Sequence, residues 1–228
     1  APIDVSALLE KADALAARIE FPPLQNDARA AVRAEFAAHG QVERALRDAA
    51  DDWRGRSIRR AVARRLAEDG RALEALALLP PAAGQVEPTE HFAVLAALLD
   101  AREVSRAAEL ARSVTEPTYR AIALARVARH AESPQGRELA REAMDVLDDV
   151  DGTVDEPKAV EEVARALAVC GLTQVLLDSV RHQWSSAPDR EHLARRVVAA
   201  APLVASRVEL AVELAQSERT VEAFLRSI

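Results

Sequence analysis

Four arginines occur at one position of a repeated sequence pattern. The clearest copies of the pattern are VRAEFAAHG (32–40), VARRLAEDG (62–70) and VARALAVCG (163–171). Weaker copies with the same spacing occupy 94–102, 124–132 and 193–201. The third residues of the six copies are Ala34, Arg64, Ala96, Arg126, Arg165 and Arg195. Because a guanidinium binds a carboxylate through two parallel hydrogen bonds, a row of these arginines would suit an acidic peptide or C-terminal tail. The alternative is that they pair with glutamates on their own helix faces and contribute little.

The pattern itself predicts a helix followed by a tight turn and a second helix. Val62 and Leu66 are four residues apart, so they share one helix face. Gly70 stands where a helix ends in a left-handed residue. A small residue follows five positions after the end of three copies, inside the next apolar stretch, at Ala45, Ala75 and Ala107. The turn positions are then predicted at 40, 70, 102, 132, 171 and 201.

A unit of this length cannot bury its apolar face alone, so stacked units must share a core. The sequence therefore predicts an all-α fold: a right-handed αα-superhelix, or α-solenoid, forming a single domain over 1–228. A lone helix near 3–19 precedes six helix pairs, near 24–53, 54–86, 87–115, 116–150, 157–185 and 187–216, and a C-terminal cap covers 217–228. The acidic insertion DDVDGTVDEP (148–157) falls outside the repeat period and is predicted to be a mobile loop.

The predicted core follows from the same spacing. The apolar residues that open each of four copies, together with those four positions later, should be almost wholly buried between helix pairs. These residues are Val32, Phe36, Val62, Leu66, Val94, Leu98, Val163 and Leu167.

Composition narrows the classes of partner. Half of the residues are hydrophobic but only 3% are aromatic, as in helices packed through Ala and Leu. The net charge of −7 argues against nucleic acid as a partner. One cysteine, Cys170, fits a reducing compartment, and no apolar run reaches the length of a membrane span. The start lacks the basic and apolar regions of a secretory signal. The cytoplasm is therefore the predicted compartment, and the preference for Arg over Lys suggests a bacterial source.

Motifs for catalysis are missing from the sequence. It contains neither the Gly-Lys-Ser/Thr of a nucleotide-binding loop nor a Gly-x-Ser-x-Gly turn. Adjacent acids such as Asp51 and Asp52 point about 100° apart on a helix and form no dyad. Cys170 precedes a helix-ending glycine and is interpreted as structural. His39 and His130 are predicted to cap helix ends, with the other histidines facing solvent. No catalytic residue, metal site or cofactor is predicted, and enzymatic activity is left open.

Two segments resemble known helical repeats. SIRRAVARRLAEDGRALEALALL (57–79) is similar to short bacterial HEAT-like repeats. ELARSVTEPTYRAIALARVARH (109–130) resembles tetratricopeptide repeats, including those attached to bacterial signalling ATPases of the STAND class. In tetratricopeptide repeats the position of the four arginines faces the concave groove, so the resemblance implies a ladder of guanidiniums there.

The resemblance implies a protein- or peptide-binding module, as the sensor part of a larger signalling or defence protein. The alternative is a HEAT-like-repeat enzyme such as an alkylpurine DNA glycosylase, against which the acidic net charge argues. Trp53 and Trp184 are predicted to pack between consecutive units; the alternative is an exposed anchor in a binding groove.

Overall fold

Helices make up most of the part of the chain that the structure describes. A computed structural model describes residues 4–47, 49, 53–79, 88–148, 150, 156–172 and 174–175, with the backbone alone at 53, 54, 156 and 157. Ten helices and no strand occur within these ranges. The helices are α1 (Val5–Ala16), α2 (Pro22–Ala38), α3 (Val42–Ala45), α4 (Trp53–Glu68), α5 (Ala72–Leu78), α6 (Thr89–Asp100), α7 (Val104–Ser113), α8 (Pro117–Ala128), α9 (Gln135–Asp148) and α10 (Glu156–Val169).

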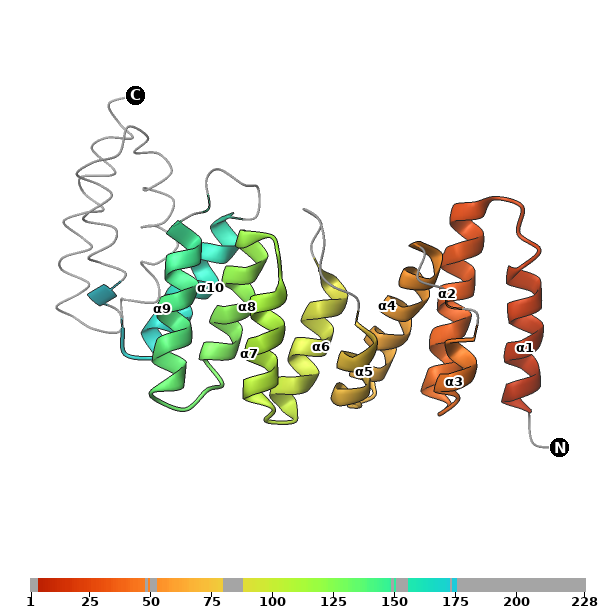
Figure 1. The fold of residues 1–228 in the computed structure, drawn as a ribbon, viewed down its shortest axis with the longest axis horizontal. Helices are drawn as coiled ribbons and strands as arrows, with labels where there is room; N and C mark the ends of the chain where they lie inside the picture. The colour runs from red at the N-terminus through yellow and green to blue at the C-terminus, as the bar shows by residue number, and fades with distance from the viewer. Residues whose placement is uncertain are drawn as a thin grey trace, which may run out of the picture. The chain divides into compact units, whose positions relative to one another are not determined.

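These helices belong to two compact units, the first running to Leu110 and the second from Ala111. In the first unit α2 lies between α1 and α4, and α4 also packs against α5 and α6 (Figure 1). In the second unit α8 packs against both α9 and α10, and α9 also contacts α10. Within each unit, helices therefore pack against helices that are close in sequence.

Several predictions concern residues outside the described ranges. The helix pair at 187–216 and the cap at 217–228 lie there, as does most of the predicted loop at 148–157. Of that loop, Asp148 is the last residue of α9, and α10 begins at Glu156. The division into six pairs within one domain stays a prediction.

Side chains that accept backbone hydrogen bonds mark the starts of two helices. The carboxylate of Asp4 accepts a hydrogen bond from the N–H of Ala7 at 3.1 Å and caps α1. The carboxylate of Glu116 accepts one from the N–H of Tyr119 at 2.8 Å at the start of α8. Pro117 follows as the first residue of α8, where a missing N–H costs nothing. These residues fix where α1 and α8 begin.

Four helices end in the same left-handed turn. After α2, the N–H of Gly40 bonds the carbonyl of Ala37 and the N–H of Gln41 bonds that of Phe36, both at 2.9 Å. This pair of bonds is the Schellman motif, which needs a positive φ at its turn residue. The same pair of bonds closes α4, α6 and α10. The turn residues and their φ values are Gly40 (77°), Gly70 (76°), Arg102 (58°) and Gly171 (69°). The predicted left-handed helix ends are confirmed at these positions.

The turn predicted at 132 lies in the connection between α8 and α9, but it lacks the left-handed residue of the other four turns. α8 ends at Ala128, its C-cap Arg129 has a φ of −70°, and Glu132 has no positive φ. Here the start of α9 packs directly against the end of α8 and the residues that follow it. A Cβ placed on Gly136, near the start of α9, would lie 2.8 Å from the carbonyl oxygen of Ala128 and 3.0 Å from that of Ala131. The glycine therefore lets α9 begin directly against the end of α8.

The predicted core is confirmed at seven of its eight positions. The exposed fraction is 2% for Phe36 and 0% for the other six, which are Val62, Leu66, Val94, Leu98, Val163 and Leu167. The three small residues of the second helices, Ala45, Ala75 and Ala107, are also completely buried. Because a larger side chain would hold the paired helices apart, alanine at these positions permits their close packing.

Val32 is the exception, and its predicted burial is wrong. It is only half-buried, whereas the next residue, Arg33, is 5% exposed. α1 packs against the side of α2 that carries Arg33, where Asp13 accepts its hydrogen bonds, and Val32 beside it is covered only in part. Arg33 stands where the next two copies have Ala63 and Leu95, which are also buried.

Candidate functional site

The first predicted groove residue, Arg64, lies on the arginine-rich helix α4. Arg56, Arg60 and Arg64 follow one another at intervals of four and so form a row along one helix face. Arg64 is exposed, and its Nε donates a hydrogen bond to Oε1 of Glu68 at 2.9 Å. Arg56 is also exposed, while the Nε of Arg60 is buried and has no hydrogen-bond partner among the described residues. This face of α4 thus carries three guanidiniums and one carboxylate and is locally positive.

Two further predicted groove residues meet at one carboxylate in the second unit. Nη2 of Arg126, on α8, and Nη1 of Arg165, on α10, each lie 3.8 Å from Oε1 of Glu162. Nη2 of Arg129, also on α8, lies 2.8 Å from the other oxygen of Glu162. Arg165 has a second carboxylate partner, Oε1 of Glu161, at 2.5 Å. The packing of α8 against α10 therefore brings Arg126 and Arg165 within reach of the same oxygen atom.

Exposure differs among the members of this cluster. The side chain of Glu162 is 14% exposed, whereas those of Arg126 and Arg165 are 31% and 39% exposed. A separation of 3.8 Å is too long for a hydrogen bond, so the attraction of these two arginines to Oε1 is Coulombic. The carboxylate thus lies beneath two guanidiniums that remain partly in contact with solvent.

The structure describes the remaining predicted groove residues only in part. Arg195 and Trp184 lie outside the described residues, and of Trp53 only the backbone is described. Arg64 belongs to the first unit, while Arg126 and Arg165 belong to the second. Of the four predicted arginines, one pair is thereby brought together within a single unit.

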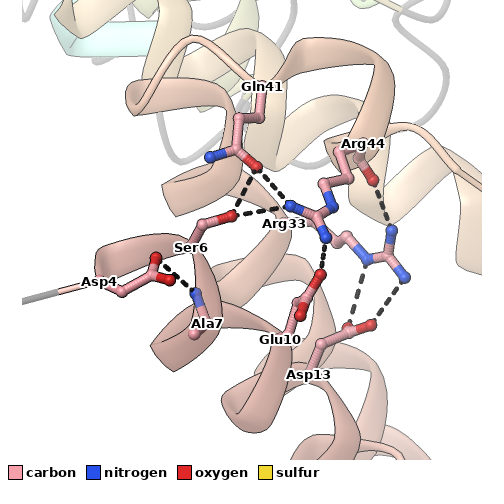
Figure 2. Close-up of polar contacts among 8 residues, drawn as sticks. All are labelled: Asp4, Ser6, Ala7, Glu10, Asp13, Arg33, Gln41 and Arg44. Carbon is pink, nitrogen blue, oxygen red and sulfur yellow. Dashed lines mark hydrogen bonds and ion pairs between the residues drawn. The ribbon is translucent and has the colours of Figure 1, made fainter.

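A polar network that the sequence analysis missed holds α1 against α2 and α3 (Figure 2). Arg33 is its centre. Its Nε and Nη2 donate to the two carboxylate oxygens of Asp13 at 3.2 and 2.8 Å, and its Nη1 donates to the carbonyl oxygen of Arg44 at 2.6 Å. The fork of a guanidinium matches the two oxygens of a carboxylate, which makes this contact specific in direction as well as favourable.

Arg44, on α3, extends the network to the first turns of α1. Its Nη1 donates to Oγ of Ser6 at 2.8 Å and to Oε1 of Gln41 at 3.0 Å, and its Nη2 forms an ion pair with Glu10 (Figure 2). The guanidinium also lies 5.5 Å from the centre of the ring of Phe36. The three helices are therefore joined by charges as well as by apolar contact.

One sequence signal pointed to this network. Asp13 lies four residues after Leu9 and three before Ala16, so a carboxylate interrupts the apolar stripe of α1 that faces α2. An acid at such a position requires a buried cation, and Arg33 provides it.

The single thiol lies in the second unit and is not activated. Burial raises the pKa of Cys170, and the charge of Arg137 offsets this only in part. The Sγ of Cys170 is 3.6 Å from the carbonyl oxygen of Ala128. Because the raised pKa keeps the thiol protonated near neutral pH, the residue is a poor nucleophile, which agrees with its structural interpretation.

The histidines are only partly as predicted. His39 is the C-cap of α2, and Nδ1 of His130 lies 3.0 Å from the carbonyl oxygen of Arg126 at the end of α8. His91 was predicted to face solvent, and this is wrong, because it is 4% exposed. Within the described part of the chain, no group of three His, Cys, Asp or Glu residues is arranged to hold a metal ion. None of the helices described there is long and apolar enough to cross a membrane.

Comparison with known proteins returns no relative: no family model, curated protein or solved structure matches the chain.

Proposed function

We propose that this chain is an α-solenoid of HEAT-like or tetratricopeptide-like repeats that binds an acidic segment of another protein. In this proposal the first helices of the repeats line a groove, and Arg64, Arg126, Arg165 and Arg195 point into it. Recognition requires no bond chemistry, because a row of guanidiniums selects carboxylates by charge and shape. Such a chain would act as the recognition part of a larger signalling or defence protein.

One observation carries the proposal: Arg126 and Arg165 come from different helices yet lie at the same 3.8 Å distance from Oε1 of Glu162. Two residues at the same position of the repeat pattern thus approach one carboxylate oxygen. A carboxylate of an incoming peptide would be attracted by the same pair of guanidiniums. The row of Arg56, Arg60 and Arg64 on α4 adds a second region of positive charge in a chain whose net charge is −7.

The test uses a fluorescently labelled oligoglutamate peptide and the 228-residue chain, with binding measured by fluorescence anisotropy at low salt. Replacing Arg126 and Arg165 together by Gln should weaken binding roughly tenfold or more, because each charge-assisted contact contributes about 1 kcal/mol or more. Binding should also weaken as the salt concentration rises.

The matched control is the double replacement of Arg137 and Arg141 by Gln. Both arginines are exposed on α9, in the same unit, and the pair removes the same net charge. An equal loss of binding in both double variants would mean that total charge alone attracts the peptide. That result would overturn the proposed groove, as would tighter binding of a duplex DNA of matched charge.

A further inference from the structure

The exposed apolar side chains of the described residues are concentrated at the start of the chain. Large hydrophobic side chains are exposed at seven positions, five of which fall between residues 5 and 24. These five are Val5 (39%), Leu8 (55%), Leu15 (55%), Phe21 (65%) and Leu24 (56%). A helix face that meets only water is ordinarily polar, and a continuous exposed apolar surface marks a contact site. The apolar surface of α1 therefore indicates a contact that covers it.

α1 has two distinct apolar or mixed faces. One face packs against the rest of the first unit. On it Ser6 hydrogen-bonds Gln41 just before α3, Asp13 accepts a hydrogen bond from Arg33 on α2, and Ala16 is buried. The other face carries Val5, Leu8, Ala12 and Leu15, which are spaced by three, four and three residues. This is the spacing of a heptad stripe, and such a stripe packs against a second helix.

We propose that the partner of this stripe is α1 of a second copy of the chain, running antiparallel. In this register Val5 of each copy packs against Leu15 of the other, and Leu8 packs against Ala12. The stripe is complementary to itself because each of its four residues meets another residue of the stripe, and the small Ala12 leaves space for Leu8. The pairing is independent of the proposed peptide groove, which involves other helices.

Charge favours the antiparallel direction. Three charged residues, Asp4, Lys11 and Arg18, border the stripe on its solvent side at intervals of seven. Antiparallel pairing brings Asp4 of each copy opposite Arg18 of the other, which gives two ion pairs, and brings the two Lys11 side chains together at the centre. A parallel pair would bring these charges opposite Leu9 and Ala16 instead, and so would gain no ion pair.

The residues needed for this pairing are accessible. Asp4, Lys11 and Arg18 are all exposed, and neither Lys11 nor Arg18 forms an ion pair with another described residue. One carboxylate oxygen of Asp4 accepts the capping hydrogen bond from Ala7, which leaves its second oxygen for a guanidinium. Arg18 follows α1 in a turn in which its N–H bonds the carbonyl of Leu15 at 3.0 Å, so it continues the line of the helix.

The predicted association is weak. Two helices of 12 residues bury less than the roughly 1,200 Å² of a stable complex, so we expect a dissociation constant on the order of 1–100 μM. Sedimentation velocity of the 228-residue chain from about 1 μM to about 300 μM should show a monomer–dimer equilibrium in this range. A monomer at every concentration would overturn the proposal.

Two sets of variants identify the surface and the direction. Replacing Leu8 and Leu15 together by Glu should abolish the dimer, whereas Leu73→Glu, at a residue that is 47% exposed on α5, should leave it unchanged. A dimer that survives the loss of Leu8 and Leu15 would show that another surface associates, and so would overturn the assignment.

Lys11 tests whether the two helices run antiparallel, because in that arrangement it lies opposite Lys11 of the other copy. An equimolar mixture of the natural chain and the Lys11→Glu variant should form the mixed dimer several-fold more readily than either like dimer, because only the mixed pair joins Lys to Glu. The excess is measured by labelling one of the two chains. A mixed dimer no more abundant than random pairing of the two chains gives would overturn the antiparallel register. Circular dichroism of each variant confirms that it remains folded.

Discussion

The two compact units hold charged groups between their helices in opposite ways. In the first unit the buried group is a cation, Arg33, which spans from α2 to the carboxylate of Asp13 on α1. In the second unit the more buried group is an anion, Glu162, and the arginines that approach it keep part of their surface in solvent. A buried guanidinium with its donors engaged can only hold the helices together, whereas half-exposed guanidiniums above a buried carboxylate can also meet a ligand.

The largest expected effect comes from removing the buried guanidinium of the first unit. Arg33→Ala should lower the free energy of unfolding by about 2–4 kcal/mol, because it leaves Asp13 and the carbonyl of Arg44 without their shared donor. Urea denaturation followed by circular dichroism measures this loss. Arg64→Ala, at an exposed ion pair, is the control and should cost less than about 0.5 kcal/mol. Equal costs for the two variants would mean that Arg33 does not bear on how α1 docks.

In the second unit, the stability of the fold depends on the absence of a side chain at Gly136. Gly136→Ala should destabilise the chain by about 1–3 kcal/mol, because the new Cβ would press on two backbone carbonyl oxygens that cannot move cheaply. Helix propensity alone predicts the opposite sign, a gain of about 0.5–1 kcal/mol. The same denaturation experiment decides between them, with Glu138→Ala, at an exposed position of α9, as the control. A stabilised Gly136→Ala variant would refute the close approach of α8 and α9.

A smaller effect, with two readouts, is expected for the anion of the second unit. Glu162→Gln should cost about 1–2 kcal/mol of stability, because three arginines lose their common counter-charge. The same change should tighten binding of the oligoglutamate peptide, since a competing carboxylate has been removed. Glu161→Gln, whose side chain is 53% exposed, should change both quantities less. Weaker peptide binding by Glu162→Gln would show that the cluster only stabilises the fold.

The smallest expected effect sharpens the comparison of helix ends. Arg102 occupies the left-handed position that glycine fills after α2, α4 and α10. Arg102→Gly should therefore stabilise the chain by about 0.5–1 kcal/mol through relief of backbone strain. Arg102→Ala should bring no such gain, because alanine retains the Cβ that makes this conformation unfavourable. Thermal denaturation of the three chains side by side measures the order of stability.

Much of the local structure could be predicted from the sequence, because it depends on residues close together in the chain. The spacing of Val62, Leu66 and Gly70 encodes an apolar helix face and the turn that ends it, and both occur where expected. The small residues of the second helices were found for the same reason. In each case neighbouring residues alone determine the backbone conformation.

The failures have a common cause in contacts between distant residues. The pattern assigned burial to Val32, but α1 packs on the side of α2 that carries Arg33, whose partner is Asp13, and Val32 is covered only in part. The pattern also assigned a turn to Glu132, which does lie between α8 and α9, but it did not predict the close contact of Gly136 with the end of α8. Neither outcome follows from a repeat frame, which treats all units as alike and contains no information about their individual neighbours.

The candidate site also depends partly on local sequence and partly on contacts between distant residues. The sequence alone determined that arginine recurs at one position of the repeat, and hence that Arg126 and Arg165 occupy equivalent places on successive first helices. Only the tertiary structure decided that these two approach one oxygen of Glu162, because the packing of α8 against α10 sets that distance. Helix periodicity is encoded residue by residue along the chain. The partner of each charge is decided by which helix packs beside it.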